Sequence, residues 1–235
     1  MCRLDPKAGE QLGTMSSDGL AERTISGLHA TVFEMLARLR PPPARVLDLG
    51  AGTGAWANRL LAAGYRVTAF ERPNAGYLGS APLIEGDLDH EFASRFGQER
   101  FDVLTCLEVV EHVENPRHLL RSARRLLEPD GAVVLTTPNI ESTAARLRFL
   151  WTGELRHFGR DPVFNEPTHI TPIHTLMFER ALEAVGLRVV EHQYDREIAS
   201  GSRWFFAAAA RLLEPLLRGP RGGNNHIYVL GRDGS

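Results

Sequence analysis

The chain has 235 residues, of which 43% are hydrophobic and 24% charged, and a formal net charge of −2 at pH 7. These values suit one globular domain, and the nearly balanced charge gives no general attraction to nucleic acid or acidic lipid. Only two cysteines are present, Cys2 and Cys106, which argues against a disulfide framework. No apolar run approaches the roughly 20 residues of a membrane span. We therefore predict a cytoplasmic protein.

Residues 1–19 are predicted to be a polar, disordered leader, and residues 20–235 a single domain. Helical and strand patterns then alternate along the chain. The predicted helices span 24–40, 55–63, 75–78, 89–95, 116–127, 174–184 and 202–218, and the predicted strands 45–49, 66–70, 82–85, 101–107, 132–136, 187–194 and 225–231. Residues 140–172 are too many for a plain connection, so we expect a lid or substrate insert there.

This alternation predicts an α/β fold, a Rossmann-like doubly wound parallel sheet with helices on both faces. The strand at 101–107 is the most apolar and is expected in the centre. Ligands of such sheets bind beyond the carboxyl ends of the strands. Side chains that follow those ends are expected to share one site: Asp48, Glu71, Asp87, Leu107, Glu108 and residues 137–139.

The run VLDLGAGTG, residues 46–54, predicts a buried strand, a glycine loop and the start of a helix. Bare glycine backbone allows a ligand to approach, and free helix N–H groups point at it. Asp48 indicates which ligand, because a buried carboxylate repels the pyrophosphate of a dinucleotide and favours a cation. S-adenosylmethionine carries an ammonium and a sulfonium and no phosphate, so we expect it there. A nicotinamide-dependent oxidoreductase and a turn that binds nothing are the alternatives.

With these residues in view, residues 44–233 resemble the class I S-adenosylmethionine-dependent methyltransferases, which implies a seven-stranded sheet with an antiparallel last strand. The resemblance implies that Asp48 holds the methionyl ammonium, that Glu71 accepts both ribose hydroxyls, and that Asp87 accepts from the adenine amino group while Leu88 packs on the ring. Alternatively, Glu71 is a surface residue, and Asp87 caps a helix. The implied donor-binding set is Asp48, Gly50, Ala51, Gly52, Gly54, Glu71, Arg72, Asp87, Leu88, Leu107 and Glu108.

The stretch EVVEHV, residues 108–113, resembles the ubiquinone-biosynthesis O-methyltransferases and the small-RNA 2′-O-methyltransferases. That resemblance implies a divalent metal (Zn, Mn, Fe or Mg) on Glu108, Glu111, His112 and His169. Spacing of i, i+3 and i+4 would place the first three on one side of a helical turn. Two alternatives remain. Without a metal, His112 is a general base or a polar anchor that Glu111 orients; otherwise the pair is a packing feature.

The predicted function is methyl transfer from S-adenosylmethionine to a small molecule, with O-methylation favoured over N- or C-methylation. A non-catalytic adenosyl-binding subunit is a further alternative. No nucleic acid partner is expected, and the chain is predicted to be a monomer or homodimer. Residues 142–160 mix arginine with aromatic side chains. We favour a lid over the substrate there, ahead of contact with a membrane surface. His157, in the same insert, is a weaker candidate for contact with substrate.

Overall fold

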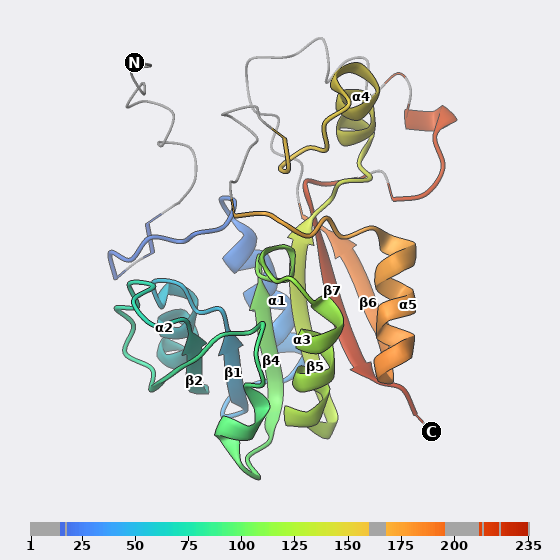
Figure 1. Cartoon of the computed structure of the whole chain (residues 1–235). Helices are drawn as coiled ribbons and strands as arrows, with labels where there is room; N and C mark the ends of the chain where they lie inside the picture. Colours follow the sequence, from blue (N-terminus) through green and yellow to red (C-terminus); the bar gives the residue numbers. More distant parts are fainter. Residues whose placement is uncertain are drawn as a thin grey trace.

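The computed structural model describes residues 15–16, 18–159, 168–195, 212, 214–220 and 222–234. Its strands form one sheet in the order β3-β2-β1-β4-β5-β7-β6. The strands are β1 (Arg45–Leu49), β2 (Arg66–Glu71), β3 (Leu83–Glu85), β4 (Phe101–Leu107), β5 (Leu127–Pro138), β6 (Leu187–Tyr194) and β7 (Asn225–Arg232). Strands β1 to β5 pair in parallel, and β7 runs antiparallel between β5 and β6 (Figure 1). This confirms the predicted fold, with β4 in the centre and the last strand antiparallel.

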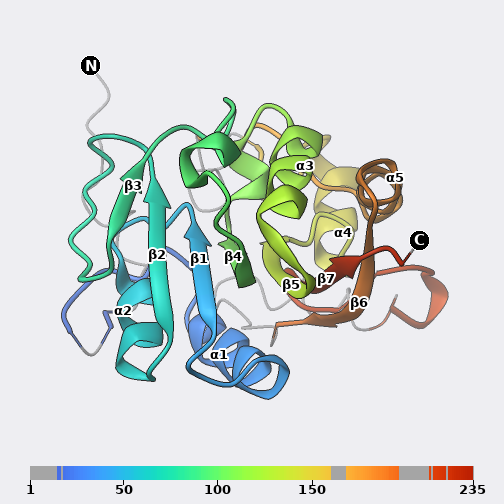
Figure 2. The ribbon, with the colours of Figure 1, turned by 90° about the horizontal axis from the view of Figure 1, so that it is seen from below.

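Helices cover both faces of the sheet (Figure 2). The α-helices are α1 (Leu28–Leu39), α2 (Ala55–Ala62), α3 (Pro116–Leu126), α4 (Thr143–Thr152) and α5 (Thr175–Val185), and the 3-10 helices are η1 (Ala93–Phe96), η2 (Val110–His112) and η3 (Glu214–Leu216). Helices α1 and α2 pack on one face, and α3 and α5 on the other. Helix α4 stands beyond the carboxyl edge of the parallel strands (Figure 1).

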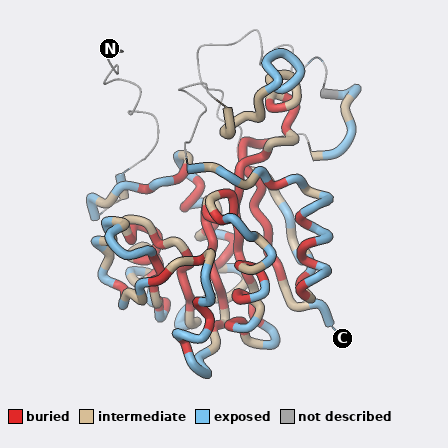
Figure 3. The backbone as a smooth tube through the Cα atoms, in the orientation of Figure 1, coloured by how far each residue is buried: buried red, intermediate tan, exposed pale blue. Residues whose placement is uncertain are grey.

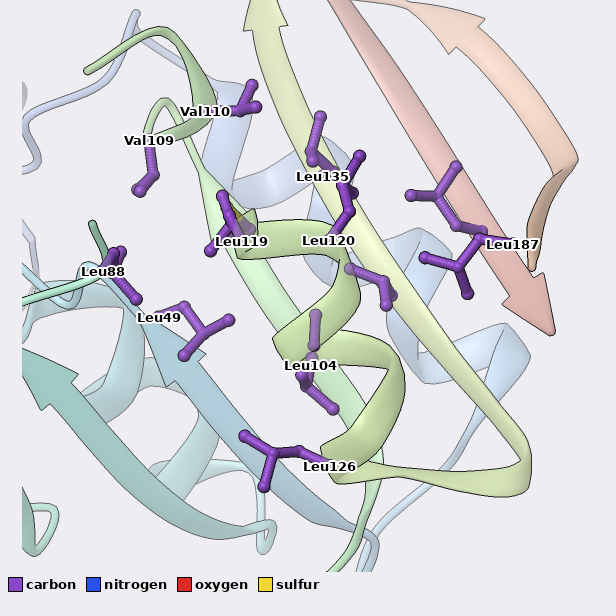
Figure 4. Close-up of a cluster of buried hydrophobic side chains, with 14 of the residues drawn as sticks. Leu49, Leu88, Leu104, Val109, Val110, Leu119, Leu120, Leu126, Leu135 and Leu187 are labelled. Carbon is purple, nitrogen blue, oxygen red and sulfur yellow. The ribbon is translucent and has the colours of Figure 1, made fainter. Parts of the chain in front are cut away.

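Each face of the sheet has its own hydrophobic core. On the α3 and α5 side, Leu104 of β4 packs in one cluster with Leu120 of α3 and Leu187 of β6 (Figure 4). On the α1 and α2 side, the core includes Leu36 and Leu60. Because β4 is covered on both faces, six of its seven residues are buried, which matches its apolar sequence (Figure 3).

Local signals at the helix ends explain several boundaries. Asn115 caps α3 by accepting a hydrogen bond from the N–H of His118, and Pro116 occupies the first turn. Helix α5 ends at Gly186, whose φ of 71° is left-handed. Both ends lie within a residue of their predicted positions.

Three predicted helices differ from the structure. Helix α1 begins at Leu28 and not at residue 24, because Gly27 takes a left-handed φ of 85°. The predicted helix at 75–78 is wrong: these residues form a loop, and the N–H of Leu78 donates to the carbonyl of Thr53. The predicted helix at 89–95 is replaced by η1. Most of the predicted helix at 202–218 and of the leader lies outside the described residues.

The insert at 140–172 contains α4, and its residues 160–167 lie outside the described part. Phe149, Leu150 and Trp151 of α4 are exposed, Leu150 and Trp151 by 83% and 81%. Both interpretations of this segment, a lid or a membrane contact, therefore stay predictions. Among the described residues, no helix has the length and apolar content that a bilayer crossing requires.

Candidate active site

A cavity of about 490 Å³ opens at the carboxyl ends of the parallel strands. Residues at the ends of the strands form its walls, together with residues of the segment before α1 and of the insert. All the predicted donor-binding residues except Gly54 line it, and so do the predicted metal ligands Glu108, His112 and His169. The fold therefore gathers nearly all of the predicted site residues around one space.

The loop requires glycine because there is no space for a side chain at two of its positions. Gly50 has a φ of 74°, and a Cβ atom there would lie 2.5 Å from Cγ2 of Val109. Gly54 has a φ of 92°, and its Cβ would lie 2.5 Å from the Cα of Gly79. The N–H of Gly50 donates to the carbonyl of Phe70, which ties the loop to β2. Only glycine meets both the conformation and the space at these two positions.

Asp48 lies buried at the end of β1, with 2% of its surface exposed. Its Oδ1 accepts a hydrogen bond from Thr105 (2.8 Å), and the Thr105 hydroxyl accepts in turn from the indole of Trp56 (3.2 Å). No hydrogen-bond donor reaches Oδ2 from the described residues. Burial raises the pKa of Asp48 to about 7, against the opposing effect of the Thr105 hydrogen bond. This unpaired oxygen is suited to a cationic ligand group.

Glu71, at the end of β2, holds its carboxylate by two backbone hydrogen bonds. Gly52 donates to Oε2 (2.6 Å) and Arg72 donates to Oε1 (2.7 Å). A carboxylate oxygen accepts more than one hydrogen bond, so both oxygens retain capacity toward the cavity. Asp87 caps a turn by accepting from the N–H of Asp89 (3.0 Å), and no α-helix follows directly. The same residue lines the cavity, so capping and ligand contact are compatible at this position.

Glu111, His112 and His169 form a cluster whose potential ligand atoms all lie within 4.8 Å of one another. The Glu111 side chain is fully buried, and within the described part of the chain neither of its oxygens has a hydrogen-bond partner. Nδ1 of His112 lies 3.0 Å from the carbonyl of Thr168, which assigns the proton of a neutral ring to Nδ1. Its Nε2 then carries the lone pair that a metal or a substrate proton requires.

Electrostatics reinforce this arrangement. Burial, followed by the charge of Glu108, raises the pKa of Glu111 well above its usual value. Burial, followed by His112, lowers the pKa of His169 to about 4. Nε2 of His169 lies 4.0 Å from Oε1 of Glu111. Buried carboxylates without partners are costly, so a cation is a fitting occupant for this set of one oxygen and two nitrogen donors.

Glu108 departs from the predicted arrangement. It precedes η2 with a left-handed φ of 54°, so it does not share a helical face with Glu111 and His112. Its N–H donates to the hydroxyl of Thr136, and that hydroxyl donates back to Oε1, each over 2.9 Å. The side chain is thereby directed to β5 and not into the cluster. The helical geometry expected for the motif is wrong at this residue, because its left-handed φ is incompatible with a right-handed helical turn.

Several residues that line the cavity were missed or undervalued from sequence. His157 lines the cavity from the insert, and burial lowers its pKa to about 3. His29 and Trp56 form another part of the wall, with ring centroids 5.2 Å apart. Asn225, the first residue of β7, also lines the cavity. Its position depends on the antiparallel insertion of β7, for which a single asparagine gives no sequence signal.

The fold and the site define a class. A doubly wound seven-stranded sheet with a glycine loop, a buried acid near the end of β1 and a second acid at the end of β2 is the architecture of class I S-adenosylmethionine-dependent methyltransferases. Residues 21–192 match the family model described as methyltransferase domain, and the chain belongs to this family.

Individual curated relatives show which methyltransferases the chain is similar to. The chain is similar to the ubiquinone biosynthesis O-methyltransferase of Xanthomonas axonopodis pv. citri, with 32% identity over 111 residues that cover 44% of this chain and 46% of the relative. It is 31% identical over 149 residues to the mitochondrial ubiquinone biosynthesis O-methyltransferase of Schizosaccharomyces pombe, covering 60% and 50%. The chain thus matches about half the length of these curated relatives.

Among solved structures, a SAM-dependent methyltransferase from Archaeoglobus fulgidus superimposes with a TM-score of 0.60 at 20% identity, covering 87% of this chain and 94% of that one. At this identity the similarity supports the fold alone. It confirms the class I architecture independently of the motifs.

Proposed function

We propose that this chain transfers a methyl group from S-adenosylmethionine to a hydroxyl oxygen of a small molecule, with a divalent metal bound by Glu111, His112 and His169. The observation that carries the proposal is a shared cavity. Asp48, a buried carboxylate with one unpaired oxygen, lines this cavity, and so do His112 and His169, which cluster with the buried carboxylate of Glu111. The names of the curated relatives support oxygen as the acceptor atom.

We assign the residues that bind the methyl donor from their positions at the strand ends. Asp48 presents an oxygen to the methionyl ammonium, and Glu71 presents its carboxylate to the ribose hydroxyls. Asp87 accepts a hydrogen bond from the adenine amino group, and Leu88 packs on the adenine ring. Methyl transfer is an in-line displacement at an activated sulfonium, so the chain contributes chiefly by holding the two reactants together in a dry site.

The acceptor half needs a hydroxyl that loses its proton as the new carbon–oxygen bond forms. A divalent ion, when bound, would supply Lewis acidity that lowers the pKa of that hydroxyl. The Thr168 carbonyl fixes the orientation of the His112 ring through Nδ1, and both His112 and His169 line the cavity. The same orientation would serve His112 as a general base without a metal, so a metal measurement separates the two mechanisms.

The test combines metal content with turnover. We expect the purified protein to bind zinc or manganese by calorimetry, and to transfer labelled methyl groups to hydroxylated small molecules. Chelation should lower the rate at least about tenfold, and added metal should restore it. Glu111→Gln should lose the metal while retaining adenosylhomocysteine. The matched control, Glu114→Gln, changes an exposed carboxylate three residues away and should behave as wild type.

Two results would count against this proposal in different ways. Turnover that ignores chelation and needs His112 would transfer the role to a metal-free base. Tight binding of a nicotinamide dinucleotide without binding of adenosylhomocysteine would reject the methyltransferase assignment altogether.

A further inference from the structure

Left-handed backbone at residues other than glycine concentrates at the cavity. Of three such residues in the described chain, two line it, Glu108 and His157. These conformations cost free energy and persist where the surrounding structure determines them, often at functional sites. At Glu108 the left-handed backbone determines the direction of the side chain. The backbone sends the side chain from the end of β4 across β5, where Thr136 holds it, toward the start of β7.

Asn225 stands at that start and is 1% exposed. Its backbone is fixed, because its N–H donates to Oδ1 of Asp195 (2.9 Å) and the residue pairs with Pro138 of β5. Its side-chain nitrogen Nδ2 is buried and makes no hydrogen bond of normal geometry within the described part of the chain, although it lies close enough to Glu108 to favour the charged form of that carboxylate. A buried donor without an acceptor destabilises the folded protein. Since Asn225 lines the cavity, a ligand oxygen can relieve that cost.

Glu108 and Asn225 have complementary hydrogen-bonding chemistry. Burial raises the pKa of Glu108 to about 7, while Thr136 and the nearby amide of Asn225 favour its charged form. The carboxylate accepts hydrogen bonds, and the amide nitrogen donates them. Both side chains belong to the β4–β5–β7 half of the sheet, whereas Asp48 and Glu71 belong to β1 and β2. The pair therefore lines the cavity from a different half of the sheet than Asp48 and Glu71, and Glu108 stands outside the Glu111–His112–His169 cluster.

We propose that Asn225 and Glu108 together recognise one neutral hydroxyl group of the methyl acceptor, an inference that rests on the function proposed above. A hydroxyl donates to Glu108 and accepts from Nδ2 of Asn225, so it satisfies both. An ether at the same place lacks the proton. A carboxylate there has no proton to donate and is repelled by the Glu108 carboxylate, whose own pKa is already raised by the charge of nearby Asp195. The pair thus selects a hydroxyl and rejects an anion.

The test measures binding of three small probes to the protein saturated with adenosylhomocysteine, by ligand-observed NMR titration. The probes are phenol, anisole and benzoate, which differ in one substituent. We expect phenol to bind at least about tenfold more tightly than anisole, as one hydrogen bond to a charged group predicts. Benzoate should bind most weakly. Asn225→Leu, which keeps the shape and removes the donor, should reduce the preference for phenol to about twofold or less.

The matched control is Asn224→Leu. Asn224 is also buried and also donates its N–H to Asp195, but it does not line the cavity. This variant should keep the full preference for phenol. A second variant, Glu108→Gln, should weaken phenol about tenfold and benefit benzoate relative to wild type, because one negative charge is removed. A circular dichroism spectrum and a thermal unfolding transition like those of the wild type confirm that each variant is folded.

A tenfold preference for phenol that survives in Asn225→Leu overturns the proposal, and so does a wild-type protein that binds anisole as well as phenol. Methyl transfer is scored separately with labelled donor. Loss of the probe preference in Asn225→Leu together with absent methyl transfer would reject the proposed reaction while supporting the hydroxyl site. Normal methyl transfer with no probe preference would do the reverse.

Discussion

At the scale of single residues, the site depends on buried carboxylates whose oxygens have been left available. Thr105 holds one oxygen of Asp48 and leaves the other without a partner among the described residues. Glu71 is fixed by two backbone N–H groups at its neighbour and in the glycine loop. Each acid therefore has a defined orientation before any ligand arrives, which reduces the cost of ordering it during binding.

The raised pKa of Asp48, about 7, predicts pH-dependent donor binding. Burial favours the protonated acid, so the carboxylate that pairs with an ammonium is scarce below pH 7. The affinity for adenosylhomocysteine should rise about tenfold per pH unit between pH 5.5 and 7, and level off above. Calorimetry across this range measures it, and Asp48→Asn should remove the slope. By the same linkage, the empty protein loses stability as pH rises from about 4 to 7, so Asp48→Asn should unfold at a higher temperature at pH 8.

Glu71→Gln tests the ribose contact. The amide has only one acceptor oxygen, so it cannot hold Gly52, Arg72 and two hydroxyls together. We expect a loss of about 10- to 100-fold in adenosylhomocysteine affinity, the size expected for hydrogen bonds to a charged group. Glu85→Gln is the control, because Glu85 pairs with Glu71 in the sheet register but is exposed and does not line the cavity. Equal affinities of the two variants would remove Glu71 from the donor site.

At the scale of elements, the loop between β1 and α2 limits what the chain tolerates. Gly54 precedes α2, and the loop of residues 72–82 packs against it through Gly79. This contact explains why the predicted helix at 75–78 does not form: the segment is held as a loop against Thr53 and Gly54. Local propensity suggested a helix, and tertiary contact overrode it.

Gly54→Ala should therefore damage both folding and donor binding. The left-handed backbone alone costs about 1–2 kcal/mol for alanine. The clash with backbone at Gly79 adds to that cost, since backbone cannot move aside cheaply. Gly97→Ala is the control, because its φ of 55° is also left-handed but its Cβ would meet nothing within 4 Å. Thermal unfolding should show the larger loss for Gly54→Ala, with weaker adenosylhomocysteine binding only in that variant.

At the scale of the whole molecule, the positions of the strands and the central place of β4 could be predicted from the sequence, whereas the contributions of Glu108 and Asn225 to the cavity could not. Strands β1, β4 and β6 have the predicted bounds. Strands β1 and β4 are buried parallel strands with strong apolar runs, whereas β6 is an antiparallel edge strand in which exposed residues alternate with less exposed ones. The donor residues follow from strand ends and a glycine loop, which are local signals. Glu108 and Asn225 do not follow from local signals. The direction of the Glu108 side chain depends on a left-handed φ, and the position of Asn225 depends on which strand pairs with β5.

The position of β7 has a consequence for how the chain acquires its structure during synthesis. Strands β1 to β5 and the donor side come from the first 138 residues, whereas Asn225 reaches Pro138 only across a long closed loop. Such distant pairing is slow and exposes open strand edges meanwhile. Nascent chains released early should therefore bind the methyl donor before Asn225 reaches the cavity. Until β7 has paired, β5 and β6 have open edges, along which the strands of two incompletely folded copies can pair.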